Sequence, residues 1–199
     1  MCHLDCTNPR DVVQPVLKSH FVLANANVRR LYWEPPWRKL LSRRSTERTN
    51  RTQIDELNRE SWDVAQSDPR AALKLAERAI ERADATSYPR GRANGLLNSG
   101  WALIYMADYE PAVQRLHEAR DAFESVEDTT GILKALNALG VVAHRLGDSE
   151  QALERYQEIL ELARNTGNRE RLLAALNNLG EVSTAMNHLK EARSYYSEA

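Results

Sequence analysis

The chain has 199 residues, a formal net charge of −1 at pH 7 and only 7% aromatic residues, which suits one ordinary domain. No apolar run approaches the roughly 20 residues of a membrane span, and the first residues lack the pattern of a secretory signal. The two cysteines, Cys2 and Cys6, lie too close together to staple a fold, which favours a reducing compartment and a cytoplasmic location.

Residues 1–50 form a basic segment without repeats, with nine Lys/Arg against four Asp/Glu, whereas residues 51–199 have eighteen against twenty-four. Val12–Trp33 is apolar enough for a helix, which the proline pair at Pro35 and Pro36 would end. Arg38–Arg51 is typical of a linker or a frayed helix. We therefore predict a basic N-terminal arm over residues 1–50.

This arm also contains residue types that bind metals or nucleic acids. The potential metal ligands are Cys2, His3, Asp5 and Cys6. A structural zinc site needs four ligands in tetrahedral geometry, and no second Cys/His cluster follows, so we expect no metal and an unstructured terminus. The run Arg38–Arg51 could contact nucleic acid, but Trp33 and Trp37 beside it are not spaced for stacking, which favours a solvated linker.

From residue 52 onward the sequence predicts four pairs of amphipathic helices, in repeats of about 52–90, 91–130, 131–168 and 169–199, the last one truncated. The expected helices are Thr52–Gln66 with Pro69–Ala83, Gly91–Met106 with Glu110–Val126, Gly131–Leu146 with Ser149–Asn165, and Arg169–Met186 with Leu189–Ala199. Asp68 and Asp148 are placed to cap the helices that follow them, and Gly147 suits a left-handed turn.

The pairs repeat at a fixed interval of about 40 residues. Asn137, Leu139, Gly140, Ala152 and Tyr156 return as Asn177, Leu179, Gly180, Ala192 and Tyr196. Such a period predicts an all-α fold, an α-solenoid of about four helix hairpins. The glycines at 100, 140 and 180 should let the second helix approach closely through Ala112, Ala152 and Ala192. We therefore expect Gly140→Leu to cost at least about 1–3 kcal/mol of stability.

These residues resemble the tetratricopeptide repeat. The third and fourth pairs fill its signature positions with Leu136, Leu139, Gly140, Ala152 and Tyr156, and with Leu176, Leu179, Gly180, Ala192 and Tyr196. The second pair keeps Leu96, Gly100 and Ala112, and the first keeps only Ala72 and Ala79. The period of about 40 looks like the long-helix variety of the repeat, which is found in bacterial signalling proteins and in light-chain or polarity adaptors. The Asp68-Pro-Arg-Ala-Ala stretch, followed by the Gly-Trp and Leu-Asn-Asn-Leu-Gly helices, looks like the sensory arrays that precede diguanylate cyclase domains or helix-turn-helix activators in bacteria.

The resemblance implies a binding scaffold that uses the concave face formed by the first helix of each pair. In that register the peptide-contacting residues would be Asn94, Asn98, Trp101, Tyr105, Lys134, Asn137, Val141, His144, Arg145, Asn177, Asn178 and Glu181, with Leu97 beside them. Five of these are asparagines, which are middling helix formers and can grip the backbone of an extended peptide. The alternative is that they brace neighbouring helices inside the array.

Three further expectations concern chemistry and partners. Lys134 and Arg145 could contact a carboxylate, but Ala138 and Ala174 occupy positions that the chaperone-tail binders of the family use, so that specificity is not carried over. His144 with Glu181 is expected to be a solvated pair, and we predict no enzyme and no cofactor. The partner should be a protein or peptide, and not a membrane or nucleic acid.

The last repeat stops at Ala199, part way through its second helix, where a solenoid needs a polar cap. Self-association through this end, or continuation into a longer protein, would cover it. The leading hypothesis is therefore a peptide-binding or protein-binding scaffold. The alternative is the sensory region of a larger bacterial signalling protein, whose cyclase or activator domain lies outside this sequence.

Overall fold

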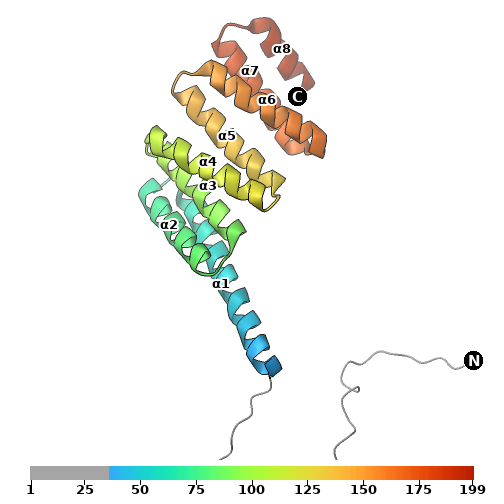
Figure 1. Cartoon of the computed structure of the whole chain (residues 1–199). Helices are drawn as coiled ribbons and strands as arrows, with labels where there is room; N and C mark the ends of the chain where they lie inside the picture. The colour runs from blue at the N-terminus through green and yellow to red at the C-terminus, as the bar shows by residue number, and fades with distance from the viewer. Residues whose placement is uncertain (1–35) are drawn as a thin grey trace, which may run out of the picture.

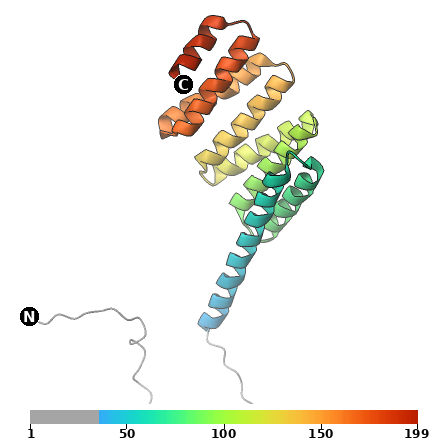
Figure 2. The same ribbon diagram turned by 180° about the vertical axis from the view of Figure 1, so that it is seen from behind.

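The computed structural model describes residues 36–199, which form an all-α array of eight helices. Figures 1 and 2 show from opposite sides that the helices follow one another as stacked hairpins. Their bounds are α1 Pro36–Val64, α2 Pro69–Ala85, α3 Pro89–Tyr105, α4 Tyr109–Ser125, α5 Thr129–Arg145, α6 Ser149–Thr166, α7 Arg169–Ala185 and α8 Leu189–Glu198. The predicted solenoid of about four hairpins is confirmed. The helix expected over Val12–Trp33 and the Cys2–Cys6 cluster lie outside the described residues.

The fold has a strict repeat. Helices α3, α5 and α7 begin at Pro89, Thr129 and Arg169, forty residues apart. The second helices keep the same interval, beginning at Pro69, Tyr109, Ser149 and Leu189. Pro69 and Pro89 each stand in the first turn of a helix, where the missing amide hydrogen costs nothing. The connection between the helices expected over Pro69–Ala83 and Gly91–Met106 is therefore shorter than predicted, since α2 ends at Ala85 and α3 begins at Pro89.

Helix α1 differs most from expectation, because it begins at Pro36 and not near Thr52. Its N-terminal part projects beyond the hairpins in both views (Figures 1 and 2). Of the two forms expected for Arg38–Arg51, a linker or a frayed helix, the structure has a helix that continues into the first hairpin. Leucine, lysine and arginine are good helix formers, so the polar composition of this stretch does not prevent a helix.

The backbone has a left-handed residue in each turn from α2 onward, whereas the turn between α1 and α2 has none. The six positions with positive φ recur every twenty residues: Ser87, Ala107, Glu127, Gly147, Gly167 and Asn187. Gly147 (φ 80°) was predicted for this role, and it suits glycine because a Cβ is disfavoured there. Ala107 (φ 59°) adopts the same conformation with a side chain, and so carries strain.

We therefore expect Ala107→Gly to stabilise the protein by about 0.5–1 kcal/mol, because it relieves this backbone strain. The reciprocal change, Gly147→Ala, should destabilise by about the same amount. A Cβ at Gly147 would meet nothing within 4 Å, so the change in stability of Gly147→Ala reports the cost of the left-handed backbone conformation alone. Urea unfolding of both variants checks the pair. Changes of equal sign in the two variants would contradict the explanation.

The glycines at 100, 140 and 180 are buried at the hairpin crossings, and a larger side chain than the predicted alanine lies closest to each, although the Ala112 backbone oxygen is also 3.7 Å from a Cβ placed at Gly100. A Cβ at Gly140 would lie 2.6 Å from Cε1 of Tyr156, and one at Gly180 would lie 2.5 Å from Cε1 of Tyr196. At Gly100 the neighbour is the Leu116 side chain, at 2.5 Å. The predicted alanines are wrong as the closest contacts because the larger side chain one helical turn later reaches back over the glycine.

Side-chain caps begin several helices. The carboxylates of Asp68 and Asp148 accept hydrogen bonds from the amides of Ala71 and Gln151, both at 3.0 Å, as predicted. Asp128 accepts from Gly131 N at 3.0 Å and also pairs with Arg90 Nη2 at 2.8 Å. Because Arg90 belongs to α3 and Asp128 precedes α5, this ion pair ties two successive first helices together.

We expect Asp128→Ala to lower the free energy of unfolding by about 1–2 kcal/mol at pH 7, through loss of the cap and the ion pair. Asp148→Ala is the matched control, with a cap and no ion pair among the described residues, and should lose less. Partial burial acts to raise the pKa of Asp128, but the Gly131 amide and the Arg90 guanidinium outweigh it and hold this pKa below its usual value.

The sign of the pH dependence follows from that lowered pKa. The contribution of Asp128 is fully present above its unfolded pKa of about 3.9 and is lost as the pH falls through the lower folded value. In urea titrations from neutral pH to pH 3, the difference between the native protein and Asp128→Ala should therefore shrink below about pH 4. A difference that grows on acidification would contradict this.

The two sides of the array differ in how the helices meet. Each first helix contacts the next first helix, α1 with α3, α3 with α5 and α5 with α7. Among residues 36–199, the second helices α2, α4, α6 and α8 make no such contacts with one another. The side lined by α1, α3, α5 and α7 is therefore the closely spaced one, and we refer to it as the inner face.

Candidate functional site

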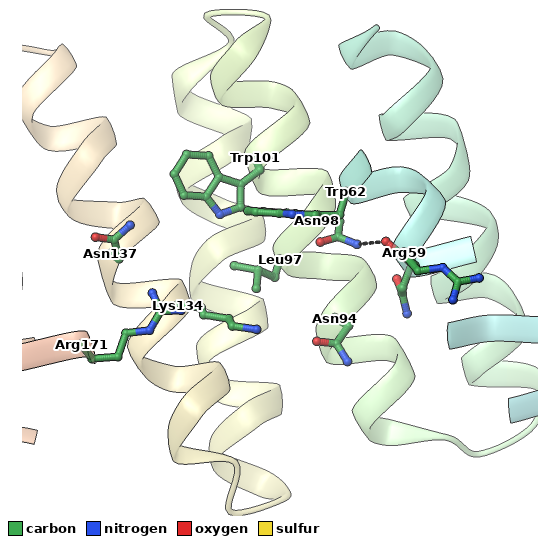
Figure 3. A pocket seen from close by; sticks show the side chains of 10 residues that line it. Arg59, Trp62, Asn94, Leu97, Asn98, Trp101, Lys134, Asn137 and Arg171 are labelled. Atoms are coloured by element: carbon green, nitrogen blue, oxygen red, sulfur yellow. Dashed lines mark hydrogen bonds between the residues drawn. The ribbon is translucent and has the colours of Figure 1, made fainter. Parts of the chain in front are cut away.

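The inner face holds a cavity of about 350 Å³, within the range of pockets that bind small ligands. Figure 3 shows how side chains from four different first helices converge on it. Its lining consists of Asn58, Arg59 and Trp62 from α1, Asn94, Leu97, Asn98 and Trp101 from α3, Lys134 and Asn137 from α5, and Arg171 from α7.

The cavity crosses the helices obliquely. Asn98 is the equivalent of Asn58 one repeat later, and Lys134 is the equivalent of Asn94. The lining residues therefore lie progressively nearer the N-terminal end of each helix, from Trp62 late in α1 to Arg171 in the first turn of α7. A single extended molecule could touch all four helices along this line, whereas no single helix offers the complete set.

Aromatic rings form one side of the cavity. The Trp62 and Trp101 rings meet edge to face, with centroids 6.1 Å apart and an interplanar angle of 87°. Tyr105 packs against Trp101 at 5.9 Å, and its hydroxyl accepts a hydrogen bond from Gln66 Nε2 at 3.1 Å. Trp62 remains 52% exposed, so an apolar surface faces the space in the cavity.

The asparagines divide into two groups. Nδ2 of Asn98 donates to the Asn58 carbonyl at 2.7 Å, and Nδ2 of Asn58 donates to the Gly91 carbonyl at 2.9 Å. Nδ2 of Asn178 donates to Oδ1 of Asn137 at 3.0 Å. Since these bonds join successive first helices, the bracing alternative describes Asn98 and Asn178. Within the described chain, the Asn94 amide has no recorded hydrogen-bond partner, and it lines the cavity.

The charge of the lining is entirely positive. It contains three cationic side chains, Arg59, Lys134 and Arg171, and no acidic residue of the described chain. Among the side chains of residues 45–199, Arg59 and Lys134 form no salt bridge, and Arg171 pairs loosely with the exposed Glu170 at 3.7 Å. In Figure 3, Lys134 and Arg171 reach in from the α5 and α7 side, opposite Arg59.

The structure brings five of the twelve predicted contact residues to this cavity: Asn94, Asn98, Trp101, Lys134 and Asn137. Tyr105 lines a smaller neighbouring hollow with Trp62 and Gln66. The others do not line the cavity. Val141 packs into the core between hairpins, His144 is half-buried, Asn178 braces Asn137, and Arg145, Asn177 and Glu181 are exposed.

Four lining residues were absent from the prediction: Asn58, Arg59, Trp62 and Arg171. Three belong to α1, where few signature residues of the repeat remain. The forty-residue shift from Asn98 to Asn58 could have revealed them. Nothing in the period points to Arg171, because its equivalents one and two repeats earlier, Gly131 and Gly91, have no side chain.

Other chemistry has little support in the described part of the chain. Residues 36–199 contain no group of three or more His, Cys, Asp or Glu side chains placed to hold a metal ion. Burial raises the pKa of Tyr156 to about 12, with the Glu181 charge adding to it, so this phenol stays protonated at neutral pH. None of the described helices combines the length and apolarity needed to cross a bilayer.

The fold and the site define a solenoid of helical hairpins with a binding cavity on its inner face. The tetratricopeptide repeat family model matches residues 131–199, which form the last two hairpins. No curated protein sequence matches the chain. The other similarities found for this chain are to solved structures.

The solved structures that share the fold include the following three. A Rap protein complexed with competence and sporulation factor has a TM-score of 0.66 and 16% identity, over 73% of this chain and 42% of its own. BtubC from P. vanneervenii has a TM-score of 0.62 and 18% identity, over 73% of this chain and 62% of its own. The Rap conjugation gene regulator of plasmid pLS20, in complex with the Phr* peptide, has a TM-score of 0.59 and 18% identity, over 66% of this chain and 37% of its own. The chain thus spans less than two thirds of each of them.

Proposed function

We propose that this chain is a non-catalytic scaffold that binds a peptide, or an extended segment of a protein, across its inner face. The observation that carries the proposal is the cavity itself, in which α1, α3, α5 and α7 each contribute lining side chains. A long, oblique and partly aromatic cavity suits an extended chain better than a compact ligand. The Phr* peptide bound to one of the similar structures supports this class of partner.

A display selection tests the proposal. A library of random peptides is selected on the native protein and on Asn94→Trp, which fills the cavity without changing its charge. Asn165→Trp is the matched control, because Asn165 is exposed on the outer helix α6. We expect enriched peptides to bind the native protein and the control, and to lose binding to Asn94→Trp. Selection of no peptide, or peptides indifferent to Asn94→Trp, would refute the proposal.

The three predicted contact residues Asn98, Asn137 and Asn178 are less suitable for this test. Because Asn98 and Asn178 hold neighbouring helices, replacing them would change stability as well as binding. Asn94 avoids this ambiguity.

A second candidate is the sensory region of a regulatory protein. The observation in its favour is the similarity to a conjugation gene regulator, whose chain extends well beyond the region matched here. Reading the gene past Ala199 tests it. A cyclase or DNA-binding domain there would support a sensory role, whereas a stop codon after further repeats would favour a free-standing scaffold.

A further inference from the structure

The sign of the charge around the cavity is opposite to that of the repeat region as a whole. Residues 51–199 contain eighteen basic and twenty-four acidic side chains, yet three basic and no acidic ones of the described chain line the cavity. The Arg171 side chain is 24% exposed, and Arg59 and Lys134 have no ion-pair partner among the described side chains of residues 45–199. Cations left unpaired in a concave site attract an anionic partner and set its position.

The cations stand around an apolar surface. Arg59 lies at the α1 end of the cavity, and Lys134 with Arg171 lies at the α5 and α7 end. Trp62, Trp101 and Leu97 are between them. A matching ligand therefore has negative groups on both sides of an apolar group, a pattern that a peptide provides when acidic residues flank a large apolar one.

The cavity also has a polar group suited to a peptide backbone. The Asn94 amide lies on the side of Lys134 that is toward Arg59, below the tryptophans in the view of Figure 3, and can both donate and accept hydrogen bonds. An extended peptide presents alternating N–H and C=O groups along its length, which one side-chain amide can pair with.

We infer that the partner is an acidic peptide segment, in which carboxylate side chains on both sides of a large apolar residue meet Arg59 at one end and Lys134 with Arg171 at the other. The apolar residue packs on Trp62 and Trp101. This inference rests on the proposed function and adds the chemical class of the partner.

Three short fluorescent peptides test it. They share a central leucine and differ only in the flanking residues, which are glutamate, glutamine or lysine. By fluorescence anisotropy at low salt, the glutamate peptide should bind about tenfold more tightly than the glutamine peptide, and the lysine peptide most weakly. Added salt should weaken the binding of the glutamate peptide. Equal affinity of the three peptides, or binding by none of them, overturns the inference.

Substitutions locate the effect. The double variant Lys134→Gln with Arg171→Gln should remove most of the advantage of the glutamate peptide over the glutamine peptide, and the part that remains is due to Arg59. Lys190→Gln with Arg193→Gln makes the same charge change on exposed residues of α8 and should have little effect. Equal losses in both double variants overturn the inference in favour of general charge attraction. A single-stranded DNA oligonucleotide that outcompetes the glutamate peptide overturns it in favour of nucleic acid.

The two failures can be told apart. If the proposed function is wrong, no selected peptide responds to Asn94→Trp. If only the inference is wrong, selected peptides still depend on the cavity, but glutamate and glutamine versions bind alike.

Discussion

Gly140→Leu is expected to lower the free energy of unfolding by at least about 1–3 kcal/mol and to reduce the thermal midpoint accordingly. Even a Cβ at this position would lie 2.6 Å from the Tyr156 ring. Tyr156 is only 3% exposed and lies in the crossing of α5 and α6. The ring cannot move aside, because it packs within the core shared with α7. The two helices must therefore separate, or the leucine must adopt a strained rotamer.

Ala185→Leu is the matched control, since Ala185 is exposed at the end of α7 and should change stability by less than about 0.5 kcal/mol. Because Tyr156→Ala removes the side chain that the leucine meets, the double variant should lose less stability than the sum of the two single variants. Urea unfolding of the single and double variants gives the coupling energy. Additive losses would show that Gly140 and Tyr156 do not share this contact.

Trp101→Ala is expected to weaken binding of the glutamate peptide by about 30-fold, equivalent to about 2 kcal/mol, because tryptophans in partly enclosed sites dominate binding energies. Trp101 lines the cavity and contacts Trp62, so its removal takes away the ring and the support of its neighbour. Trp101→Phe should retain part of the affinity.

Tyr105→Ala is the control, since Tyr105 packs on Trp101 but lies outside the cavity. We expect the affinity of Tyr105→Ala for the glutamate peptide to fall by less than about threefold. Circular dichroism melts must show that both variants are folded at the assay temperature. Equal losses of peptide affinity in Trp101→Ala and Tyr105→Ala would mean that these rings support the packing of the helices and do not form the contact surface for the peptide.

The sequence predicted the parts of the fold that depend on periodic, local chemistry. The interval from Gly140 to Gly180 predicted the repeat. Gly147 predicted a left-handed turn and Asp148 a helix cap, and the structure confirms both. The long α1 was missed because the basic run Arg38–Arg51 lacks an apolar stripe, although its residues favour helix. Apolar periodicity detects only the helices that pack.

The candidate site was predicted only where it follows the repeat. Asn94, Trp101 and Lys134 were found from the register of the first helices. Arg171 was not, because a residue that breaks the repeat reaches the cavity only through the relative placement of α5 and α7. The two functions of the asparagines also needed coordinates, since a braced Asn98 and an unbraced Asn94 look alike in the sequence.

The central claim is that the cavity between the first helices is the binding surface, and side-chain signals in a ¹H–¹⁵N correlation spectrum test it most directly. On titration with a selected peptide, we predict that the indole N–H signals of Trp62 and Trp101 and the side-chain amide signals of Asn94 shift progressively. The signals of the outer helices α2, α4 and α6 should stay in place. Shifts confined to those outer helices, with both indole signals unchanged, would contradict the account.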